Sequence, residues 1–348
     1  MNDRVTARRS LGRSGLGVTT ASLGAGGLGN FYRRITNAES RALLEVAWEA
    51  GIRYVDTAPF YGRGRSERRL GAFLEEHPRD SFVLSTKVGR ILTPARGGAR
   101  EDGIFLDPAP FDWHYDYSYD GVMRSYEMSL QRLGLSSIDI LLVHDIGVAL
   151  HGDGAGRQLK ILKDGGLRAL DELRSRGEIR AYGLGVTEIA ACLDCLDYAD
   201  PDVFLLAGRF SLLEQNGAKP FLDRCRARGA SVVIGGVFNS GILATGAVPD
   251  ARYNYAPATE DVKRTVRRLE AVCSRYSVPL SAAALQFPLA HPAVASVLLG
   301  AGTIASLKRC IDSLEFQIPL DLWGELAAEH LLDPEWVPAL DASARNAR

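Results

Sequence analysis

The sequence predicts a closed (β/α)8 barrel, and three observations lead to that fold class. Short apolar or β-branched runs alternate about eight times with longer segments of helical periodicity, as in a parallel sheet whose strands are joined by helices. The runs are apolar almost throughout, which is typical of strands covered on both faces. No shift in composition divides the 348 residues. We therefore expect one barrel domain over residues 1–348 rather than an open sheet.

The strands are expected where the apolar runs lie: Thr19–Leu23, Arg53–Val55, Phe82–Thr86, Ile138–Val143, Ile179–Leu184, Val203–Leu206, Ser231–Ile234 and Ser296–Leu299. The helices are expected at Ala38–Ala50, Ser66–His77, Tyr119–Leu133, Leu167–Arg176, Ile189–Leu196, Phe221–Arg228, Glu260–Tyr276 and Ile304–Leu314, with a further helical stretch before the last strand. Local signals support these bounds, because Asn37 is a good N-cap residue and Gly51 and Gly134 are typical helix stops.

Two long loops are predicted, Val88–Ser118 and Asp145–Gly166. Both follow strands, so they belong at the end of the barrel where active sites lie. The first is rich in aromatic residues, including Trp113, Tyr115 and Tyr117. Two interpretations remain open for it: an aromatic lid over a pocket, or a loop that packs a small core of its own.

Composition excludes several classes of function. There are 41 basic and 42 acidic residues, so the net charge of −1 gives no reason to expect nucleic acid or an anionic membrane as a partner. The apolar window Ser281–Gly300 is interrupted by Gln286 and Pro288, so we expect it to be buried rather than to span a membrane. The five cysteines form no disulfide framework, and Cys192–Cys195 fits ordinary helix positions better than a metal or redox site. We expect a soluble, cytoplasmic protein without a metal.

Two glycine-rich segments resemble nucleotide-binding motifs, and they lead to different predictions. Gly24–Gly29 (GAGGLG) matches the dinucleotide fingerprint, but the next helix begins only near Asn37, so the fingerprint lacks the helix that would face the pyrophosphate. The second motif begins with Gly300-Ala301-Gly302 and lies between the last strand and a helix. In a barrel, this turn is either a phosphate site at a helix N-terminus or simply a tight turn.

Four polar residues follow apolar strands: Asp56, Tyr61, Lys87 and His144. Asp56 and Lys87 end successive strands, so a mutual ion pair is expected, because a charge at the end of a buried strand is costly unless it is paired. A tyrosine beside the ammonium should have its pKa lowered from about 10, which makes it a general acid or base for carbonyl–alcohol interconversion. His144 is expected to hydrogen-bond the same substrate oxygen. Each residue taken alone has a purely structural alternative.

These motifs give the sequence a resemblance to the aldo-keto reductase family: YVDTAPFYG carries the family's Asp and Tyr, STK its Lys and LLVHD its His. The resemblance runs from about Thr19 to Leu314. It implies a barrel that binds NAD(P)(H) at its C-terminal rim, with Asp56, Tyr61, Lys87 and His144 as the catalytic residues. Further segments resemble the aldose 1-dehydrogenase branch, which includes L-fucose, D-threo-aldose and L-galactose dehydrogenases, with pyridoxal 4-dehydrogenase as a relative.

The resemblance also implies a set of cofactor contacts. The expected residues are Gly24, Ala25, Asp56, Thr187, Arg209, Phe238, Asn239, Ser240, Gly241, Leu243, Gly300, Ala301, Gly302, Thr303 and Ser306. The family's side-chain amides for the nicotinamide are missing, because Gly185, Val186 and Ala207 stand at those positions. Gly300, Gly302 and Ser306 stand where NADP-preferring members place a cation, which favours NAD and leaves NADP possible. Trp113 and Tyr117, together with Tyr61 and His144, are the expected substrate contacts.

The predicted reaction is oxidation of an aldose at C1 to its lactone, with Tyr61 as the acid/base group. A pyridoxal 4-dehydrogenase or a general aldehyde reductase is the alternative within the same chemistry. Two other classes are weighed: a lyase that forms a Schiff base on Lys87, and a regulatory subunit that senses the cofactor. The expected partner is a small sugar or aldehyde, and the sequence does not predict an oligomeric state.

Overall fold

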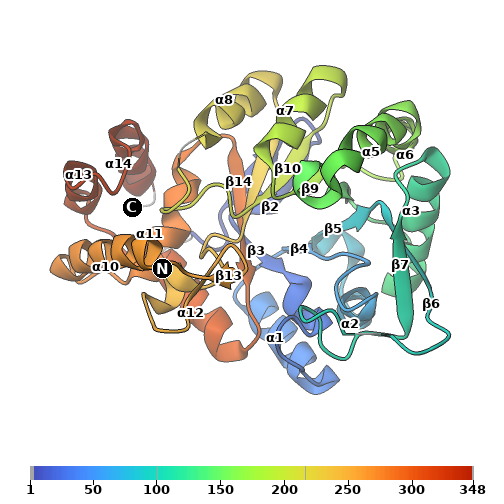
Figure 1. The fold of residues 1–348 in the computed structure, drawn as a ribbon, viewed down its shortest axis with the longest axis horizontal. Helices are drawn as coiled ribbons and strands as arrows, with labels where there is room; N and C mark the ends of the chain where they lie inside the picture. The colour runs from blue at the N-terminus through green and yellow to red at the C-terminus, as the bar shows by residue number, and fades with distance from the viewer. Residues whose placement is uncertain (1–3, 100, 216, 347–348) are drawn as a thin grey trace.

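The computed structural model describes residues 4–99, 101–215 and 217–346. Eight parallel strands close into a barrel in chain order, and β14 pairs with β3 to complete the circle (Figure 1). The strands are β3 (Ala21–Gly24), β4 (Tyr54–Asp56), β5 (Val83–Val88), β8 (Ile140–His144), β9 (Ala181–Val186), β10 (Val203–Ala207), β11 (Ser231–Gly235) and β14 (Val294–Gly300). The predicted fold class is confirmed.

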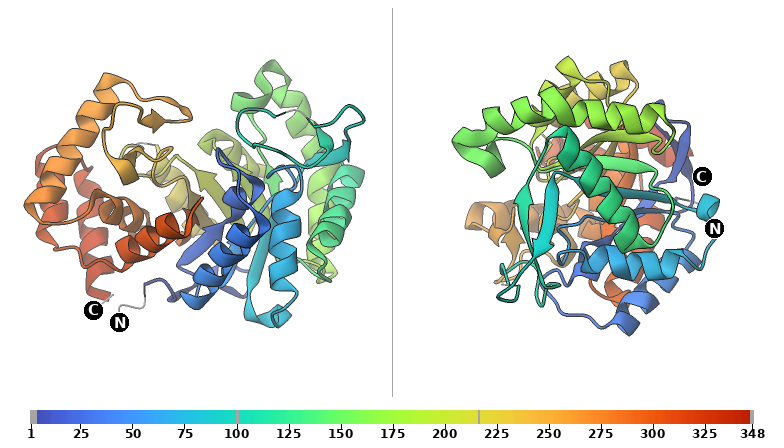
Figure 2. Two further views of the ribbon diagram at one scale, coloured as in Figure 1. Left: turned by 90° about the horizontal axis from the view of Figure 1, so that it is seen from below. Right: turned by 90° about the vertical axis from the view of Figure 1, so that its right-hand side faces the viewer.

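Helices surround the barrel, and their apolar faces pack on the outer faces of the strands (Figures 1 and 2). They are α1 (Asn37–Glu49), α2 (Arg65–Leu74), α3 (Tyr119–Leu133), α6 (Leu167–Ser175), α7 (Ile189–Tyr198), α8 (Ala218–Arg228), α10 (Glu260–Arg275), α11 (Leu280–Gln286) and α12 (Ile304–Glu315). The N-cap of α1 is Thr36 rather than Asn37, because its side chain accepts the backbone N–H of Glu39 in a capping box.

An N-terminal hairpin that the sequence analysis did not predict lies across the barrel. Its strands are β1 (Arg8–Leu11) and β2 (Leu16–Thr19), so Thr19 ends this hairpin instead of beginning a barrel strand. Leu11 joins the apolar cluster formed by inward-facing side chains of the barrel strands. Arg9 donates to the carbonyl of Val294 at the start of β14. The hairpin therefore covers the N-terminal ends of the strands, opposite the end where the polar residues gather.

The two predicted long loops contain regular structure. The first holds an antiparallel hairpin of β6 (Arg90–Pro94) and β7 (Phe111–Tyr115), and residue 100, which comes between them in the sequence, lies outside the described residues. The second is almost entirely helical, with α4 (Val148–His151), η3 (Gly152–Gly154), α5 (Ala155–Ile161) and a π-helical segment η4 (Leu162–Gly166). A third insertion after β11 carries α9 (Ile242–Thr245) and the small hairpin β12 (Arg252–Tyr253) and β13 (Ala256–Pro257).

The C-terminal segment forms two further helices, α13 (Asp321–Ala328) and α14 (Val337–Asn346), preceded by η6 (Pro334–Trp336). They lie beside α10 at one side of the barrel (Figure 1). Trp336 is buried between Phe210 and Phe287, at centroid distances of 5.0 and 5.8 Å. The apolar window Ser281–Gly300 forms α11, η5 (Phe287–Ala290) and β14, and nearly all of it is buried. None of the helices in the described residues is long and apolar enough to cross a membrane.

Candidate active site

Four side chains predicted from the sequence meet in one cavity of about 640 Å³. Asp56 ends β4, Lys87 lies near the end of β5, and His144 ends β8. Tyr61 belongs to the turn that joins β4 to α2. Because β4, β5 and β8 are neighbours in the barrel, the C-terminal ends of these strands bring the four residues together.

Asp56 and Lys87 form the predicted ion pair. Lys87 Nζ lies 2.6 Å from Asp56 Oδ2 and donates also to the carbonyl of Thr57 at 2.9 Å. The other carboxylate oxygen of Asp56 accepts from Ser85 Oγ at 2.7 Å. Both charged side chains are only 2% exposed. Burial alone would lower the pKa of Lys87, but Asp56 and then Tyr61 outweigh it, so its pKa is raised and the ammonium stays charged.

The pKa of Tyr61 corrects one expectation. Lys87 Nζ lies 4.8 Å from the centre of the Tyr61 ring and lowers the pKa of the phenol, as predicted. Burial acts in the opposite direction and is the larger effect, so the pKa is raised to about 12. The expected net lowering is therefore wrong for the protein alone. Tyr61 is a protonated phenol at neutral pH, with an ammonium beside it that stabilises the phenolate when a proton leaves.

His144 faces Tyr61 across the cavity. The two rings are perpendicular, with centroids 5.9 Å apart. Burial, and then the positive charges of Arg90 and Lys87, lower the pKa of His144 well below 6.5. The imidazole is thus neutral, so it acts as a hydrogen-bonding group and not as a cation.

Aromatic and apolar side chains form most of the wall around these groups. Phe105 stacks on Tyr61 at 5.8 Å, and Phe60 lies edge-on to His144 at 6.2 Å. Phe31, Ile104, Ile146 and Leu150 also line the cavity. None of these was predicted individually as a site residue. The available signals were the aromatic content of the loop Val88–Ser118, which holds Phe105, and the proximity of Phe60 to Tyr61 in the sequence.

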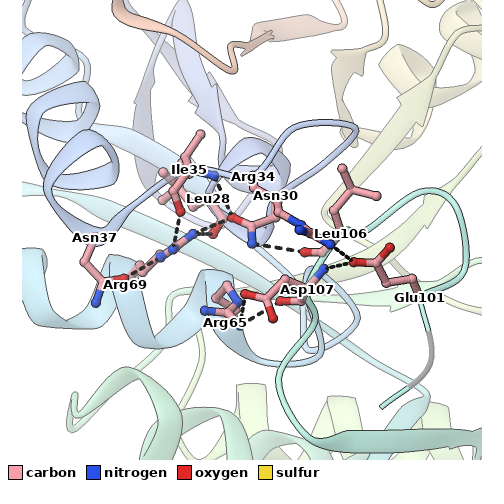
Figure 3. A network of polar contacts seen from close by, with 10 residues as sticks. All are labelled: Leu28, Asn30, Arg34, Ile35, Asn37, Arg65, Arg69, Glu101, Leu106 and Asp107. Atoms are coloured by element: carbon pink, nitrogen blue, oxygen red, sulfur yellow. Dashed lines mark hydrogen bonds and ion pairs between the residues drawn. The ribbon is translucent and has the colours of Figure 1, made fainter. Parts of the chain in front are cut away.

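The segment that carries Phe105 is anchored by polar contacts with two other parts of the chain (Figure 3). Arg65 of α2 donates to the backbone carbonyl of Asp107, and Arg34 pairs with Glu101. Asn30 Nδ2 donates to the carbonyl of Leu106. These contacts hold the tip of the β6–β7 hairpin beside the loop after β3, so Phe105 is placed over Tyr61.

Trp113 and Tyr117, the expected substrate contacts from the same loop, lie outside the cavity lining. Tyr117 is fully buried, and its hydroxyl donates to the backbone carbonyls of His144 and Asp145 at 3.0 and 2.9 Å. Trp113 packs against Phe60 at 5.3 Å. Both interpretations of this loop are correct for a part of it. Phe105 covers the site as a lid would, whereas Trp113 packs behind the site.

The cavity continues from the four polar residues to the N-terminus of α12. Gly24, Gly26, Gly235, Gly236, Gly300 and Gly302 all line it. A Cβ built on Gly26, Gly300 or Gly302 would meet nothing within 4 Å, so the space beside these residues is open. An elongated cleft with a proton-transfer group at one end and a glycine turn before a helix at the other fits a dinucleotide.

The expected cofactor residues divide into two groups. Those that line the cavity are Gly24, Asp56, Thr187, Phe238, Ser240, Gly241, Gly300, Ala301 and Gly302. Those that the structure does not bring to its wall are Ala25, Arg209, Asn239, Leu243, Thr303 and Ser306. Thr303 and Ser306 form the capping box of α12, and Asn239 is buried against Ser211. Arg209 donates to the carbonyl of Thr187 at 2.9 Å, one layer behind the cavity.

The GAGGLG motif is explained by packing. Its residues form η1 (Ala25–Gly29) instead of the start of an α-helix. A Cβ on Gly27 would lie 2.4 Å from the carbonyl oxygen of Ala301, and one on Gly29 would lie 2.6 Å from the backbone carbon of Tyr61. These glycines let the loop after β3 approach both the catalytic turn and the last glycine turn. The rejection of a Rossmann unit is confirmed by the barrel topology.

Comparison with known proteins gives a consistent result. The model of the aldo/keto reductase family matches residues 21–328. A pyridoxal 4-dehydrogenase of Microbacterium luteolum is 44% identical, over 95% of this chain and 100% of the relative. A D-threo-aldose 1-dehydrogenase of a Pseudomonas species is 38% identical, over 92% of this chain and 96% of the relative.

Solved structures show the same fold. The holo form of an aldo-keto reductase of Bacillus halodurans has a TM-score of 0.72 at 24% identity, covering 97% of this chain and 96% of that one. A glycerol dehydrogenase of Gluconobacter oxydans has a TM-score of 0.72 at 19% identity, covering 94% and 98%. At these identities the likeness concerns the arrangement of the chain.

Proposed function

The chain belongs to the aldo/keto reductase family, and we propose from this that it oxidises the C1 hydroxyl of a cyclic hemiacetal to a lactone. An aldose is the first candidate substrate. The family makes it an oxidoreductase that works with a nicotinamide cofactor. The observation that carries the proposal is the meeting of Asp56, Tyr61, Lys87 and His144 in the cleft that ends at the Gly300–Gly302 turn.

The roles of the four residues follow from their contacts. A bound nicotinamide supplies the hydride acceptor in oxidation and the hydride donor in reduction. Tyr61 takes the proton of the substrate hydroxyl during oxidation and returns it during reduction. Lys87 stabilises the phenolate, and Asp56 keeps Lys87 charged and directed toward Tyr61. Neutral His144 holds the substrate oxygen by a hydrogen bond. Because its ammonium is paired at 2.6 Å, Lys87 is poorly suited to form a Schiff base.

Pyridoxal is the second candidate substrate, and two observations favour it. The pyridoxal 4-dehydrogenase relative matches nearly the whole chain. The walls beside Tyr61 are aromatic, with Phe31, Phe60 and Phe105 lining the cavity, so a flat heteroaromatic ring would find stacking partners there.

We propose NAD as the preferred cofactor. No cation stands at Gly300, Gly302 or Ser306, and Ser306 is occupied by its capping contacts with Thr303. Arg33 reaches this turn by donating to the carbonyl of Gly302 at 2.8 Å, but its charge is already compensated by Glu39. A 2′-phosphate would therefore find no uncompensated charge among these residues.

The direct test follows the absorbance of reduced nicotinamide while NAD⁺ and NADP⁺ are each combined with L-fucose, D-arabinose, L-galactose and pyridoxal. We expect turnover with at least one of these substrates, and a kcat/KM that is higher with NAD⁺ than with NADP⁺. Cofactor binding without turnover on any of them, or on the corresponding aldehydes in the reverse direction, would contradict the proposed reaction. A higher kcat/KM with NADP⁺ would contradict only the cofactor preference.

A further inference from the structure

An ion pair outside the four predicted residues is built into the same cavity. Arg90, the first residue of β6, is 4% exposed, and its Nη2 lies 2.5 Å from Asp145 Oδ2. Its guanidinium carbon lies 4.0 Å from the ring centre of Phe60, 5.0 Å from Trp113 and 5.3 Å from Tyr115. Burying a guanidinium is costly unless a carboxylate and favourable ring faces compensate it. The aromatic cage around Arg90 therefore fixes the carboxylate of Asp145 in one place.

The backbone of Asp145 is also fixed. The residue follows β8 directly and has a φ of 46°, in the left-handed region. Its N–H donates to the carbonyl of Gly185 at 3.0 Å, and its carbonyl accepts from the Tyr117 hydroxyl at 2.9 Å. A strained backbone that is held from both sides is typical of a functional position.

One oxygen of the Asp145 carboxylate makes no hydrogen bond within the described residues. Oδ2 accepts from Arg90 Nη2 at 2.5 Å and lies 3.4 Å from His144 Nε2, without a hydrogen bond between these two atoms. Across residues 4–99, 101–215 and 217–346, no hydrogen bond to Asp145 Oδ1 is formed. The side chain lines the cavity and is 29% exposed. Since a carboxylate oxygen accepts hydrogen bonds and this side chain is exposed to the cavity, Oδ1 is available to a hydrogen-bond donor of the ligand.

The carboxylate of Asp145 is adjacent to His144, the residue proposed to hold the reacting oxygen of the substrate. A carboxylate oxygen beside Nε2 favours the tautomer of neutral His144 with its proton on that nitrogen. His144 Nδ1 is buried without a partner among the described residues, which agrees with this tautomer. The hydrogen-bond donor for the reacting oxygen and the acceptor Oδ1 thus lie next to each other. A substrate that carries the reacting oxygen on one carbon and a hydroxyl on the next can hydrogen-bond both His144 and Asp145 Oδ1.

We infer that Asp145 is a specificity-determining residue that accepts a hydrogen bond from a hydroxyl on the carbon next to the reacting carbon. The inference rests on the proposed function and names the substrate class: 2-hydroxyaldehydes and their cyclic hemiacetals, as in an aldose. Pyridoxal carries its ring hydroxyl one bond further from the reacting carbon, so Asp145 favours the aldose of the two candidates.

The test compares the reduction of 2-hydroxypropanal and propanal, which differ only in this hydroxyl. The measured quantity is the ratio of the two kcat/KM values, because any effect of a substitution on His144 or Tyr61 common to both substrates cancels in it. We expect the wild type to prefer 2-hydroxypropanal, and Asp145→Ala to reduce the ratio by about 10- to 100-fold, the effect of one hydrogen bond to a charged group.

Two further variants make the result decisive. Arg90→Met/Asp145→Leu removes both charges of the ion pair together, so it leaves no unpaired Arg90 and keeps the test available if Asp145→Ala fails to fold. It should lose the same selectivity. Glu188→Gln changes a second carboxylate of the cavity wall and should retain the ratio. A wild-type ratio near one, or a ratio unchanged in both Asp145 variants, would overturn the inference while leaving the proposed function intact. Absence of turnover with either aldehyde would instead count against the proposed function.

Discussion

The hydroxyl of Tyr61 is subject to two opposing influences. Burial favours the neutral phenol, whereas the Lys87 ammonium favours the phenolate, and burial is the stronger, with a pKa of about 12. In aldehyde reduction the protonated phenol is the form required. In oxidation the phenolate is required, so its stabilisation by Lys87 matters most in that direction.

A pH profile follows from this pKa. Because the folded-state pKa of Tyr61 lies above the working range, the phenolate fraction rises with pH, and kcat/KM for oxidation should rise from about pH 6 to about pH 9. Reduction uses the phenol and should not rise. His144 should add no inflection near its ordinary pKa of 6.5, since it is already neutral there. Steady-state rates in both directions check this, and a fall in oxidation with rising pH would contradict it.

Substitution of Lys87 should separate the two directions. Lys87→Met removes the charge that lowers the pKa of Tyr61, so that pKa should rise further. We expect oxidation to lose about 10²- to 10⁴-fold in kcat, and reduction to lose less. Lys219→Met, on α8 away from the cavity, is the matched control. Equal losses in both directions would show that Lys87 does not act through the ionisation of Tyr61.

At this scale the sequence predicted that the four polar residues would meet, because polar residues that follow neighbouring buried strands lie at the same end of the barrel. It could not predict the pKa of Tyr61, since the dominant effect is burial by Phe105 and its neighbours. It also did not single out Asp145 of the motif LLVHD, because its ion pair joins it to Arg90, 55 residues earlier and on a hairpin that was not predicted.

Among the elements, the segment η1 (Ala25–Gly29) connects the two ends of the cleft. Gly27 lies so close to Ala301 that a methyl group cannot be added without displacing backbone. Gly27→Ala should therefore lower the free energy of unfolding by about 1–3 kcal/mol, as overpacking does. Gly26→Ala adds the same methyl into open space and should leave stability nearly unchanged. Denaturant unfolding of both variants checks this, and equal stabilities would refute the packing account.

Prediction of the elements succeeded where periodicity is strong. The barrel strands are short apolar runs, and α10 and α12 have clear caps and long amphipathic patterns. The hairpins were missed for a physical reason. β6 and β7 are separated by 16 residues, so the turn dipeptides Gly97-Gly98 and Asp102-Gly103 do not stand directly between two strand patterns as in a short hairpin. The strands also pack around Arg90 and Phe60 rather than on a sheet of their own.

For the whole molecule, the N-terminal hairpin closes one end of the barrel and leaves the other to the active site. Leu11 is fully buried in the cluster inside the barrel. Leu11→Ala should lower the free energy of unfolding by about 2–5 kcal/mol. Ser10→Ala, on the exposed side of β1, should change it by less than about 0.5 kcal/mol. Thermal unfolding of the two variants would contradict the account if Leu11→Ala were as stable as the wild type.

The topology of the whole chain was predictable because eight apolar runs separated by helices allow few closed arrangements. The packing of the N-terminal hairpin and of the C-terminal helices on the barrel was not predictable. Their contacts join segments far apart in the sequence, such as Arg9 with Val294 and Trp336 with Phe210, and no local pattern carries that information.

The proposed reaction depends most on proton transfer by Tyr61, and Tyr61→Phe tests this step directly. The variant keeps the ring that packs on Phe105 and removes only the hydroxyl. We predict that it binds NAD(H) with a Kd near that of the wild type by fluorescence titration, while kcat falls about 10²- to 10⁴-fold. Tyr126→Phe, on α3 outside the cavity, should keep full turnover. A Tyr61→Phe enzyme that turns over at the wild-type rate would contradict the central claim.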